Sequence, residues 1–283
     1  MASAFAFQRQ KLYVKGRKWL RVSAIEEKQG TMKFHFSASE HDEAKYRLIE
    51  LTKLYGQTAL EKATHVVALG GDGHMLHVLH DTLQFGLPVF GMNCGHLGFL
   101  MNDFSDSALP DRIAAAEIAP IHPIRMTATA SDGGEHEAIA INEVSLLRQT
   151  HNAAHLAITV NDKKQLEQLV CDGILIATPA GSTAYNLSAH GPVIPLGGGL
   201  LALTPISAFR PRRWRGALLS DRSRVVLDIL DHRFRPVSAS ADSAEVRYVT
   251  RVVVEQANDI TINLLYDPGV SLSDRATREQ FLT

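Results

Sequence analysis

The chain has 283 residues, enough for about two domains of ordinary size. The hydrophobic fraction of 45% suffices for buried cores, and 29 basic against 30 acidic residues give a formal net charge of −1. This balance predicts neither a nucleic-acid partner nor an anionic-membrane surface. Cys94 and Cys171, the only cysteines, lack metal-ligand spacing, and no apolar run approaches the roughly 20 residues that span a bilayer. With no secretory signal either, we expect a soluble, cytoplasmic protein.

The first 31 residues differ from the rest. Six basic residues precede the first acidic residue, Glu26. The segment is either a targeting or nucleotide-contacting arm, or a poorly ordered extension ahead of a true start at Met32. Because chain termini are often untethered, we interpret 1–31 as a poorly ordered extension.

A regular pattern follows over 32–123. Residues 32–36 alternate as in a strand, 37–40 read as a capping box, and a helix with apolar residues at helical spacing ends near Gly56. A strand at 65–69, a helix with Leu76, Leu79 and Leu83 on one face, and a strand at 87–91 come next. This β-α-β-α-β order predicts a parallel sheet covered by helices, that is, a Rossmann-like α/β domain.

The sequence pattern changes after Pro123. Short β-rich runs, separated by turn formers, predict a second domain over 124–266 that is mostly antiparallel β. These runs are 126–130, 138–147, 156–160, 173–178, 224–229, 246–255 and 260–266. One helix is expected from near Ser182. The tail at about 267–283 is expected to pack back on the first domain.

The glycine-rich turn after strand 65–69 is the first candidate site. Gly70, Gly71 and Gly73 allow backbone N–H groups to face an anion, and Asp72 could hold a metal ion, orient a hydroxyl or accept a proton. The alternative is an ordinary strand-to-helix turn with Asp72 as the N-cap. The chain contains neither a G-x-G-x-x-G fingerprint nor a G-x-x-x-x-G-K-[ST] phosphate loop.

Two further motifs contain polar residues in apolar surroundings. In 93–100, Asn93 and two glycines form either a ligand-contacting loop or a structural Asx turn. Asn142-Glu143 interrupts the apolar run 138–147, where a charge is costly unless it is paired or faces a site. The adjacent acceptors suit a ribose diol, and the alternative is an edge-strand charge that faces water.

The longest motif is Asp172–Asn186. An apolar strand leads through a Pro/Gly turn into Ser182 and Thr183, both good N-cap residues. A helix N-terminus with hydroxyls is suited to an anion or a ribose, and Tyr185 could stack on a base. The alternative is a well-capped helix with a buried tyrosine.

In this order and spacing, Gly70–Gly73, Asn93–Leu100, Asn142-Glu143 and Thr178–Tyr185 resemble the NAD kinase family. The resemblance covers about 64–257, and 203–217 is similar to bacterial members. The glycine motif alone is shared with diacylglycerol and sphingosine kinases and with phosphofructokinases. The Asn-Glu pair and the Thr-Pro-x-Gly-Ser-Thr-Ala-Tyr segment narrow the choice.

The resemblance implies ATP-dependent phosphorylation of the 2′-hydroxyl of NAD's adenosine ribose, giving NADP. It implies an α/β domain, a β-rich sandwich-like domain with the site between them, and a homodimer or homotetramer. Mg²⁺ would be carried by the ATP phosphates, without metal ligands from the protein.

The resemblance also implies a role for each matching residue. Asp72 would be catalytic, contacting the reacting hydroxyl, with Gly70, Gly71, Gly73 and His74 near the phosphates. Asn93 and Phe99 are implied to bind NAD without a more specific role. Asn142 and Glu143 would hold the ribose. Thr183, Ala184 and Tyr185 would surround the adenine, with Ser182 close by. Asp172 and Ser188 would face the nicotinamide half, and the backbone of Ala208 would line the same pocket.

Three positions depart from the family pattern. His74 replaces a common Thr or Ser, Ala180 replaces a Thr, and Asp242-Ser243 replaces Asp-Gly. A protonated His74 could contact phosphate instead. Polyphosphate as a second donor, and NADH as an acceptor, stay open. Two alternatives are a lipid kinase that shares the glycine loop and a non-catalytic NAD or NADP sensor.

Overall fold

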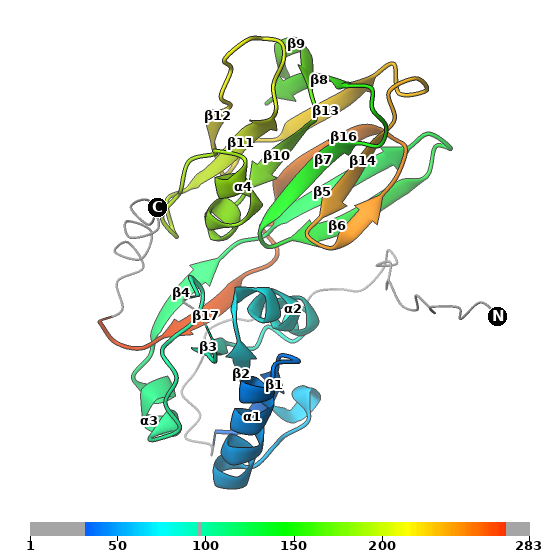
Figure 1. Ribbon diagram of the computed structural model, residues 1–283. Helices are drawn as coiled ribbons and strands as arrows, with labels where there is room; N and C mark the ends of the chain where they lie inside the picture. The colour runs from blue at the N-terminus through cyan, green and yellow to red at the C-terminus, as the bar shows by residue number, and fades with distance from the viewer. Residues whose placement is uncertain (1–31, 96–97, 270–283) are drawn as a thin grey trace, which may run out of the picture.

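The computed structural model describes residues 32–95 and 98–269, so the predicted extension 1–31 and all but three residues of the predicted tail lie outside it. The described chain forms two bodies, an α/β domain and a β-rich domain, with helix α2 (Asp72–Thr82) on the side of the first that faces the second (Figure 1). This confirms the predicted fold class. In the described ranges, no helix is long and apolar enough to cross a membrane.

The first domain begins with the predicted β-α-β-α-β order: β1 (Phe34–Ala38), α1 (Asp42–Tyr55), β2 (His65–Gly70), α2 and β3 (Val89–Asn93). A short 3₁₀ helix, η1, covers Leu60–Lys62. β1 pairs with β2, and β2 with β3, both in parallel register. Helix α2 buries Met75, Val78, Leu79 and Thr82, an i, i+3, i+4, i+7 pattern that seats one face on the sheet.

The predicted capping box at 37–40 is wrong. Helix α1 begins at Asp42, and its N-cap, His41, makes no side-chain capping bond. The extended chain continues past β1, because the Ser39 N–H donates to the carbonyl of Leu69 at 2.9 Å. The predicted stop is confirmed: Gly56 has a φ of 77°, and its N–H closes the helix on Thr52.

Strand 260–266, which we grouped with the second domain, belongs to the first. As β17 (Ile262–Tyr266) it lies between β3 and β4 (Glu117–Ile121), giving the sheet order β1-β2-β3-β17-β4. It runs parallel to β3 and antiparallel to β4. Leu264 and Tyr266 are buried in the core beneath α2, whereas Leu265 faces the α1 side. Burial on both faces is typical of a central strand in such a sheet.

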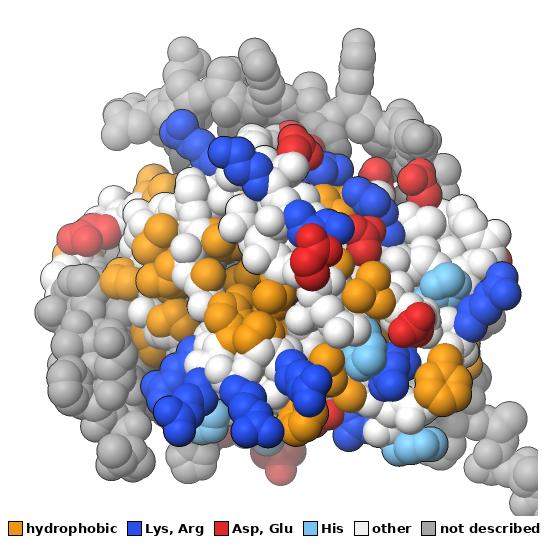
Figure 2. Space-filling view, turned by 90° about the horizontal axis from the view of Figure 1, so that it is seen from above, with side chains coloured by type: hydrophobic (Ala, Val, Ile, Leu, Met, Phe, Trp, Pro, Cys, Tyr) orange, Lys and Arg blue, Asp and Glu red, His pale blue; other side chains and the backbone are white. Residues whose placement is uncertain are grey.

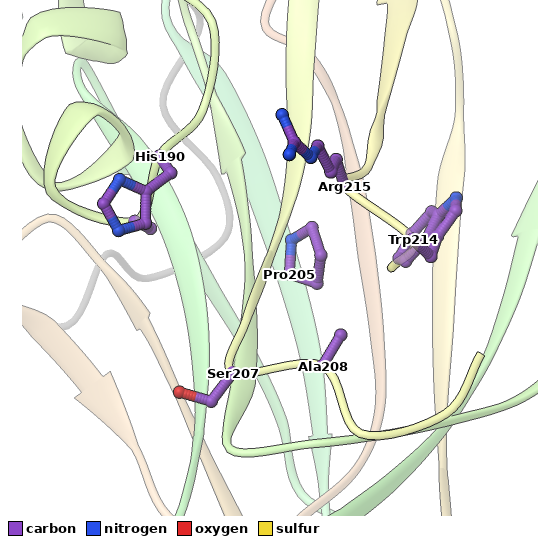
Figure 3. A pocket seen from close by; sticks show the side chains of 7 residues that line it. His190, Pro205, Ser207, Ala208, Trp214 and Arg215 are labelled. Carbon is purple, nitrogen blue, oxygen red and sulfur yellow. The ribbon is translucent and has the colours of Figure 1, made fainter. Parts of the chain in front are cut away.

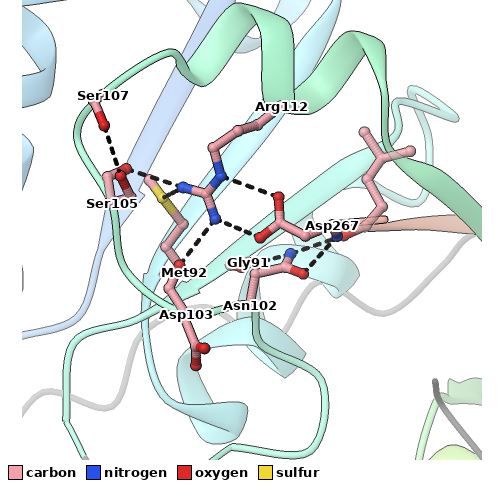
Figure 4. Close-up of polar contacts among 9 residues, drawn as sticks. Gly91, Met92, Asn102, Asp103, Ser105, Ser107, Arg112 and Asp267 are labelled. Atoms are coloured by element: carbon pink, nitrogen blue, oxygen red, sulfur yellow. Dashed lines mark hydrogen bonds and ion pairs between the residues drawn. The ribbon is translucent and has the colours of Figure 1, made fainter. Parts of the chain in front are cut away.

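An arginine fixes the end of β17. Arg112 of helix α3 (Leu109–Ala114) donates to both carboxylate oxygens of Asp267, at 2.5 and 3.0 Å. It also donates to the carbonyls of Asp103 and Ser105 (Figure 4). Its guanidinium carbon lies 5.1 Å from the ring centroid of Phe90. These contacts tie the start of the tail to the first domain.

The second domain is a sandwich of two six-stranded sheets. The first has the order β12-β11-β10-β7-β14-β15, and the second β6-β5-β16-β13-β8-β9. Every pairing in them is antiparallel. Alternate residues of both sheets, such as Met126 and Leu146, share one buried core. The strands are β5 (Ile124–Ala130), β6 (Glu135–Ala140), β7 (Glu143–Arg148), β8 (Ala154–Val160), β9 (Lys163–Cys171), β10 (Gly173–Ala177), β11 (Leu200–Ile206), β12 (Ala217–Ser220), β13 (Val225–Leu230), β14 (Val237–Ala241), β15 (Ala244–Val246) and β16 (Val249–Gln256).

Two predictions in this domain need correction. The run 138–147 is not one strand but parts of β6 and β7, joined through Ile141-Asn142. The helix expected from Ser182 is only the 3₁₀ turn η2 (Ala180–Thr183) followed by α4 (Tyr185–Ser188).

On the face seen from above, hydrophobic side chains gather beside Lys and Arg side chains, with acidic ones interspersed (Figure 2).

Candidate active site

Asp72 opens helix α2 at the carboxyl end of β2. The N-cap is Gly71, so the interpretation of Asp72 as the N-cap is wrong. Its carboxylate instead accepts the backbone N–H groups of Phe99 at 2.7 Å and Leu100 at 2.9 Å. A carboxylate has about four acceptor positions, so these two bonds leave capacity for a ligand hydroxyl.

The glycines beside Asp72 have different surroundings. A Cβ on Gly71 or Gly73 would meet no atom within 4 Å, so open space lies over this part of the loop. A Cβ on Gly70 would come within 3.0 Å of Ser39 and His74, so this glycine is needed for packing. The structure thus leaves room for a ligand at two of the three glycines assigned to the phosphates.

His74 lies in the first turn of helix α2, next to the glycine loop. Its Nε2 is 3.2 Å from the hydroxyl of Ser37, at the end of β1. Burial lowers the pKa of His74 below the ordinary value for histidine, which favours the neutral imidazole near pH 7. A phosphate contact by a protonated His74 is therefore disfavoured in the free protein.

The loop after β3 packs against the glycine loop that carries Asp72. Asn93 accepts the N–H of Gly95 at 3.0 Å, as in the Asx turn that we weighed, and the Cys94 N–H donates to Gly70. The Phe99 side chain is only 4% exposed and packs in the first-domain core. Phe99 therefore offers its backbone to Asp72, and the assignment of its side chain to NAD stays a prediction.

Asn142 and Glu143 lie at the connection between β6 and β7. Strand β7 is central in its sheet, with β10 and β14 as neighbours, so the edge-strand alternative is wrong. Asn142 Oδ1 and Glu143 Oε2 are both buried without a hydrogen-bond partner. Since buried polar atoms are nearly always paired, two orphaned acceptors side by side indicate a site that a ligand completes.

The environment of Glu143 favours its protonated form. Burial raises the pKa of Glu143 to about 7, and the nearby charge of Asp242 acts in the same direction. A carboxyl group poised near neutrality can accept from, or donate to, a ribose hydroxyl.

The segment after β10 braces this turn. Thr178 donates its hydroxyl to the carbonyl of Ile141 at 2.6 Å and accepts the Gly181 N–H at 3.1 Å. A Cβ on Gly181 would lie 2.2 Å from the carbonyl oxygen of Asn142, so the close approach of the two segments requires glycine there.

Ser182 does not act as a helix N-cap. It is fully buried, and its hydroxyl bonds the carbonyl of Pro179 at 2.7 Å and the N–H of Ile194 at 2.9 Å. Asn186 is buried as well and accepts from Thr204 at 2.7 Å. These bonds fold the chain back on itself, and the proposed role of Ser182 at NAD stays a prediction.

The residues predicted to surround adenine remain accessible. Thr183 and Ala184 are half-buried, and Tyr185 is 38% exposed, so the alternative of a buried tyrosine is wrong. Ser188, at the end of α4, is also exposed. All four are open to a ligand.

Two of the three residues assigned to the nicotinamide half, Asp172 and Ala208, lie at the opposite end of β10, whereas Ser188 lies on α4. Asp172 forms an ion pair with Arg148 at 2.6 Å. Ala208 lines a pocket of about 420 Å³ formed by the end of β11, the loop after it and the segment after α4 (Figure 3). The other lining residues are Ala189, His190, Pro205, Ser207, Trp214 and Arg215.

A buried cluster joins the two domains at the site. Ile141 and Ala180, next in sequence to Asn142 and Gly181, pack in the same cluster as Met75 and Phe99 of the first domain. The glycine loop and the Asn-Glu turn are therefore neighbours. In residues 32–95 and 98–269, no group of three or more His, Cys, Asp or Glu is placed to hold a metal ion.

Sequence reasoning missed Asp242 as part of the site. This residue, in the β14–β15 turn, has a φ of 47°, and its carboxylate bonds the backbone of 141–143. We noted the Asp-Ser pair only as a departure in a turn, because its partners lie about 100 residues earlier. An acidic residue ending one strand of a hairpin is too common a feature to single out.

A glycine loop that holds a carboxylate lies against two buried acceptors without hydrogen-bond partners at a domain junction, an arrangement suited to a nucleotide-dependent phosphotransferase. Residues 19–115 match the ATP-NAD kinase N-terminal domain, and residues 141–258 match the ATP-NAD kinase C-terminal domain. The chain belongs to the NAD kinase family.

Relatives and solved structures agree with this assignment. The chain is 54% identical to an NAD kinase of Hyphomonas neptunium over 250 residues, covering 88% of this chain and 98% of the relative. It is 52% identical to an NAD kinase of Caulobacter vibrioides over 246 residues, covering 87% and 95%.

The fold is similar to that of yeast NADH kinase complexed with NADH, with a TM-score of 0.75, 19% identity, and 89% and 88% of the two chains covered. It is also similar to an NAD kinase from Archaeoglobus fulgidus in complex with ATP, with a TM-score of 0.70, 20% identity, and 89% and 100% covered.

Proposed function

We propose that the protein transfers the γ-phosphoryl group of ATP to the 2′-hydroxyl of the adenosine ribose of NAD, giving NADP and ADP. The observation that carries this proposal is the pair of orphaned buried acceptors, Asn142 Oδ1 and Glu143 Oε2, beside the open glycine loop. Family membership supports the same reaction.

In the proposed mechanism, Asn142 and Glu143 hold the ribose while Asp72 orients the 2′-hydroxyl toward the phosphate. Phosphoryl transfer depends mainly on positioning and charge stabilisation, so orientation by Asp72 counts as much as proton removal. The N–H groups at the start of α2 would stabilise charge on the transferred phosphate.

Mg²⁺ bound to the ATP phosphates would neutralise their charge during transfer. The proposal keeps the ion on ATP, without metal ligands from the protein. It also retains Thr183, Ala184 and Tyr185 at the adenine, and Asp172, Ser188 and Ala208 at the nicotinamide half.

The setting of the enzyme is also part of the proposal. We infer a homodimer or homotetramer in the cytoplasm, with polyphosphate as a second donor to be tested. The lipid-kinase and sensor alternatives have no support in the comparisons, in which the curated relatives are named NAD kinases.

The test mixes the purified protein with NAD, ATP and Mg²⁺ and couples the product to an NADP-specific dehydrogenase. We expect NADP formation that disappears in Asp72→Ala. Glu143→Ala should raise the KM for NAD much more than the KM for ATP. No product with NAD or NADH, from ATP or polyphosphate, would contradict the proposal.

A further inference from the structure

The Asp242 carboxylate is the anchor of the Asn-Glu turn. Its Oδ2 accepts the N–H of Ile141 at 2.7 Å, and its Oδ1 accepts those of Asn142 at 3.0 Å and Glu143 at 3.1 Å. The Asp242 N–H donates to the Glu143 carbonyl at 3.1 Å. Three consecutive N–H groups directed at one carboxylate fix the backbone of the turn that presents the orphaned acceptors.

A fourth donor reaches the same carboxylate from the other domain. His80 Nε2 is 2.7 Å from Asp242 Oδ2, and because an ionised carboxylate only accepts, the imidazole donates. His80 belongs to α2, the helix that begins at Asp72. With a rise of about 1.5 Å per residue, His80 lies about 12 Å along the helix from Asp72.

The aspartate of the pair is buried and the histidine is partly exposed. The Asp242 side chain is 1% exposed and that of His80 is 26% exposed. Four donors match the roughly four acceptor positions of a carboxylate, so Asp242 is satisfied within the protein. It therefore has no acceptor position to offer a substrate, and any role it has is to position other groups.

We propose that His80 and Asp242 are a positioning pair that sets the ribose-holding turn relative to the phosphate loop. One end of α2 presents Asp72, and the other holds, through Asp242, the backbone of Asn142 and Glu143. The pair thereby fixes the distance between the acceptor hydroxyl and the phosphate it attacks. The inference rests on the proposed function.

The fold does not depend on this contact alone. The buried cluster that contains Met75, Leu79, Ile141 and Ala180 also joins the two domains. His80→Ala should therefore fold, but the Asn-Glu turn and the glycine loop should lose their fixed position relative to each other. Because misplacement of about 1 Å can cost a hundredfold in rate, the effect should fall on kcat.

The experiment measures kcat and both KM values for His80→Ala and His80→Gln. We expect a loss of about tenfold to a hundredfold in kcat for His80→Ala, with the KM for ATP little changed. His80→Gln should recover most of this loss, because its amide Nε2 can donate where the imidazole Nε2 does.

The matched control is His155→Ala. His155 of β8 also faces an aspartate, Asp231 at 3.9 Å, and is 18% exposed, but it lies outside the site. Its removal should leave kcat unchanged. Thermal unfolding and active-site titration of every variant separate a loss of folded protein from a loss of rate per site.

A double-mutant cycle adds a second test. In Asp242→Asn the amide cannot accept from both sides, so kcat should fall at least as far as in His80→Ala. The double variant should fall no further than Asp242→Asn, since the pair acts as a unit. Additive losses, an unchanged kcat in His80→Ala, or no rescue by Gln would overturn the inference. An inactive wild-type protein would instead contradict the proposed function.

Discussion

The carboxylate of Asp72 accepts the backbone N–H of Phe99 at 2.7 Å, which ties the start of α2 to the loop after β3. The contact needs glycine next to Phe99, because a Cβ on Gly98 would come within 2.9 Å of Asp72 Oδ1. The residue assigned to catalysis therefore also fixes the loop that borders it. Changes at Asp72 should be read with both roles in mind.

Asp72→Asn should lower kcat by at least about a hundredfold, the lower range for loss of a general base. Asn has one acceptor oxygen, so it can keep only one of the bonds to Phe99 and Leu100. Steady-state kinetics of the variant check this expectation. Asp81→Asn, an exposed change on the same helix, is the control and should be near wild type. Turnover close to wild type in Asp72→Asn would contradict the assignment.

Glu143 should make stability depend on pH. Its folded-state pKa, about 7, lies above the ordinary 4.5, so the native state binds more protons than the unfolded state between these values. The associated stability is fully present below pH 4.5 and is lost as pH rises through about 7. Its size is at most about 3–4 kcal/mol, from about 1.4 kcal/mol per pKa unit.

Urea unfolding of wild type and Glu143→Gln across pH 4.5 to 8 measures this contribution, since Gln does not titrate. The free energy of unfolding of wild type should fall relative to that of the variant over this range. Glu245→Gln, at an exposed position of β15, should leave the pH dependence as in wild type. Parallel curves for wild type and Glu143→Gln would show that Glu143 is not buried as described.

Two glycine-to-alanine changes should distinguish a glycine that leaves room for a ligand from a glycine that close packing requires. Gly73→Ala has free space for its methyl group and lies in a helix, so stability should stay equal or rise by up to about 1 kcal/mol. If phosphates approach this position, the KM for ATP should rise. Gly181→Ala would place its Cβ against the backbone of Asn142, and should destabilise the protein by about 1–3 kcal/mol. Normal ATP kinetics in Gly73→Ala would indicate that the phosphates do not bind close to this position of the loop.

Asp267→Asn should lower the free energy of unfolding by about 1.5–3 kcal/mol, the range for hydrogen bonds to charged groups. The Asp267 side chain is 22% exposed, and Arg112, which it pairs with, is 17% exposed. Asp259→Asn breaks the more exposed pair with Arg125 and should cost under about 1 kcal/mol. Denaturant midpoints measure both, and equal losses would show that burial does not distinguish the two pairs.

Local patterns predicted the first half of the fold well. The β-α-β-α-β order and the end of α1 at Gly56 follow from periodicity and turn residues, which act over a few positions. Strand β4 of the first sheet and strands β9, β11, β12 and β14 of the second domain were not predicted. β9 in particular carries exposed polar residues such as Lys163 and Lys164, so no apolar run marks it.

Long-range pairing accounts for the remaining errors. The apolar run of β17 is compatible with a strand in either domain. Only its pairing with β3 and β4 places it in the first sheet. In the site, Asn142 and Glu143 could be singled out because they interrupt an apolar run. Asp242 and His80 could not, because their partners are distant in sequence and neither stands out in its own segment.

The position of β17 has a consequence for how the protein is made. The central gap between β3 and β4 in the first sheet can be filled only after residue 266 has been synthesised. A fragment ending near residue 123 would expose two unpaired strand edges, and we expect it to be sensitive to protease where the longer chain resists. The sandwich, whose strands all lie between 124 and 256, is free to fold earlier. On the ribosome, the domain encoded first is therefore the one completed last.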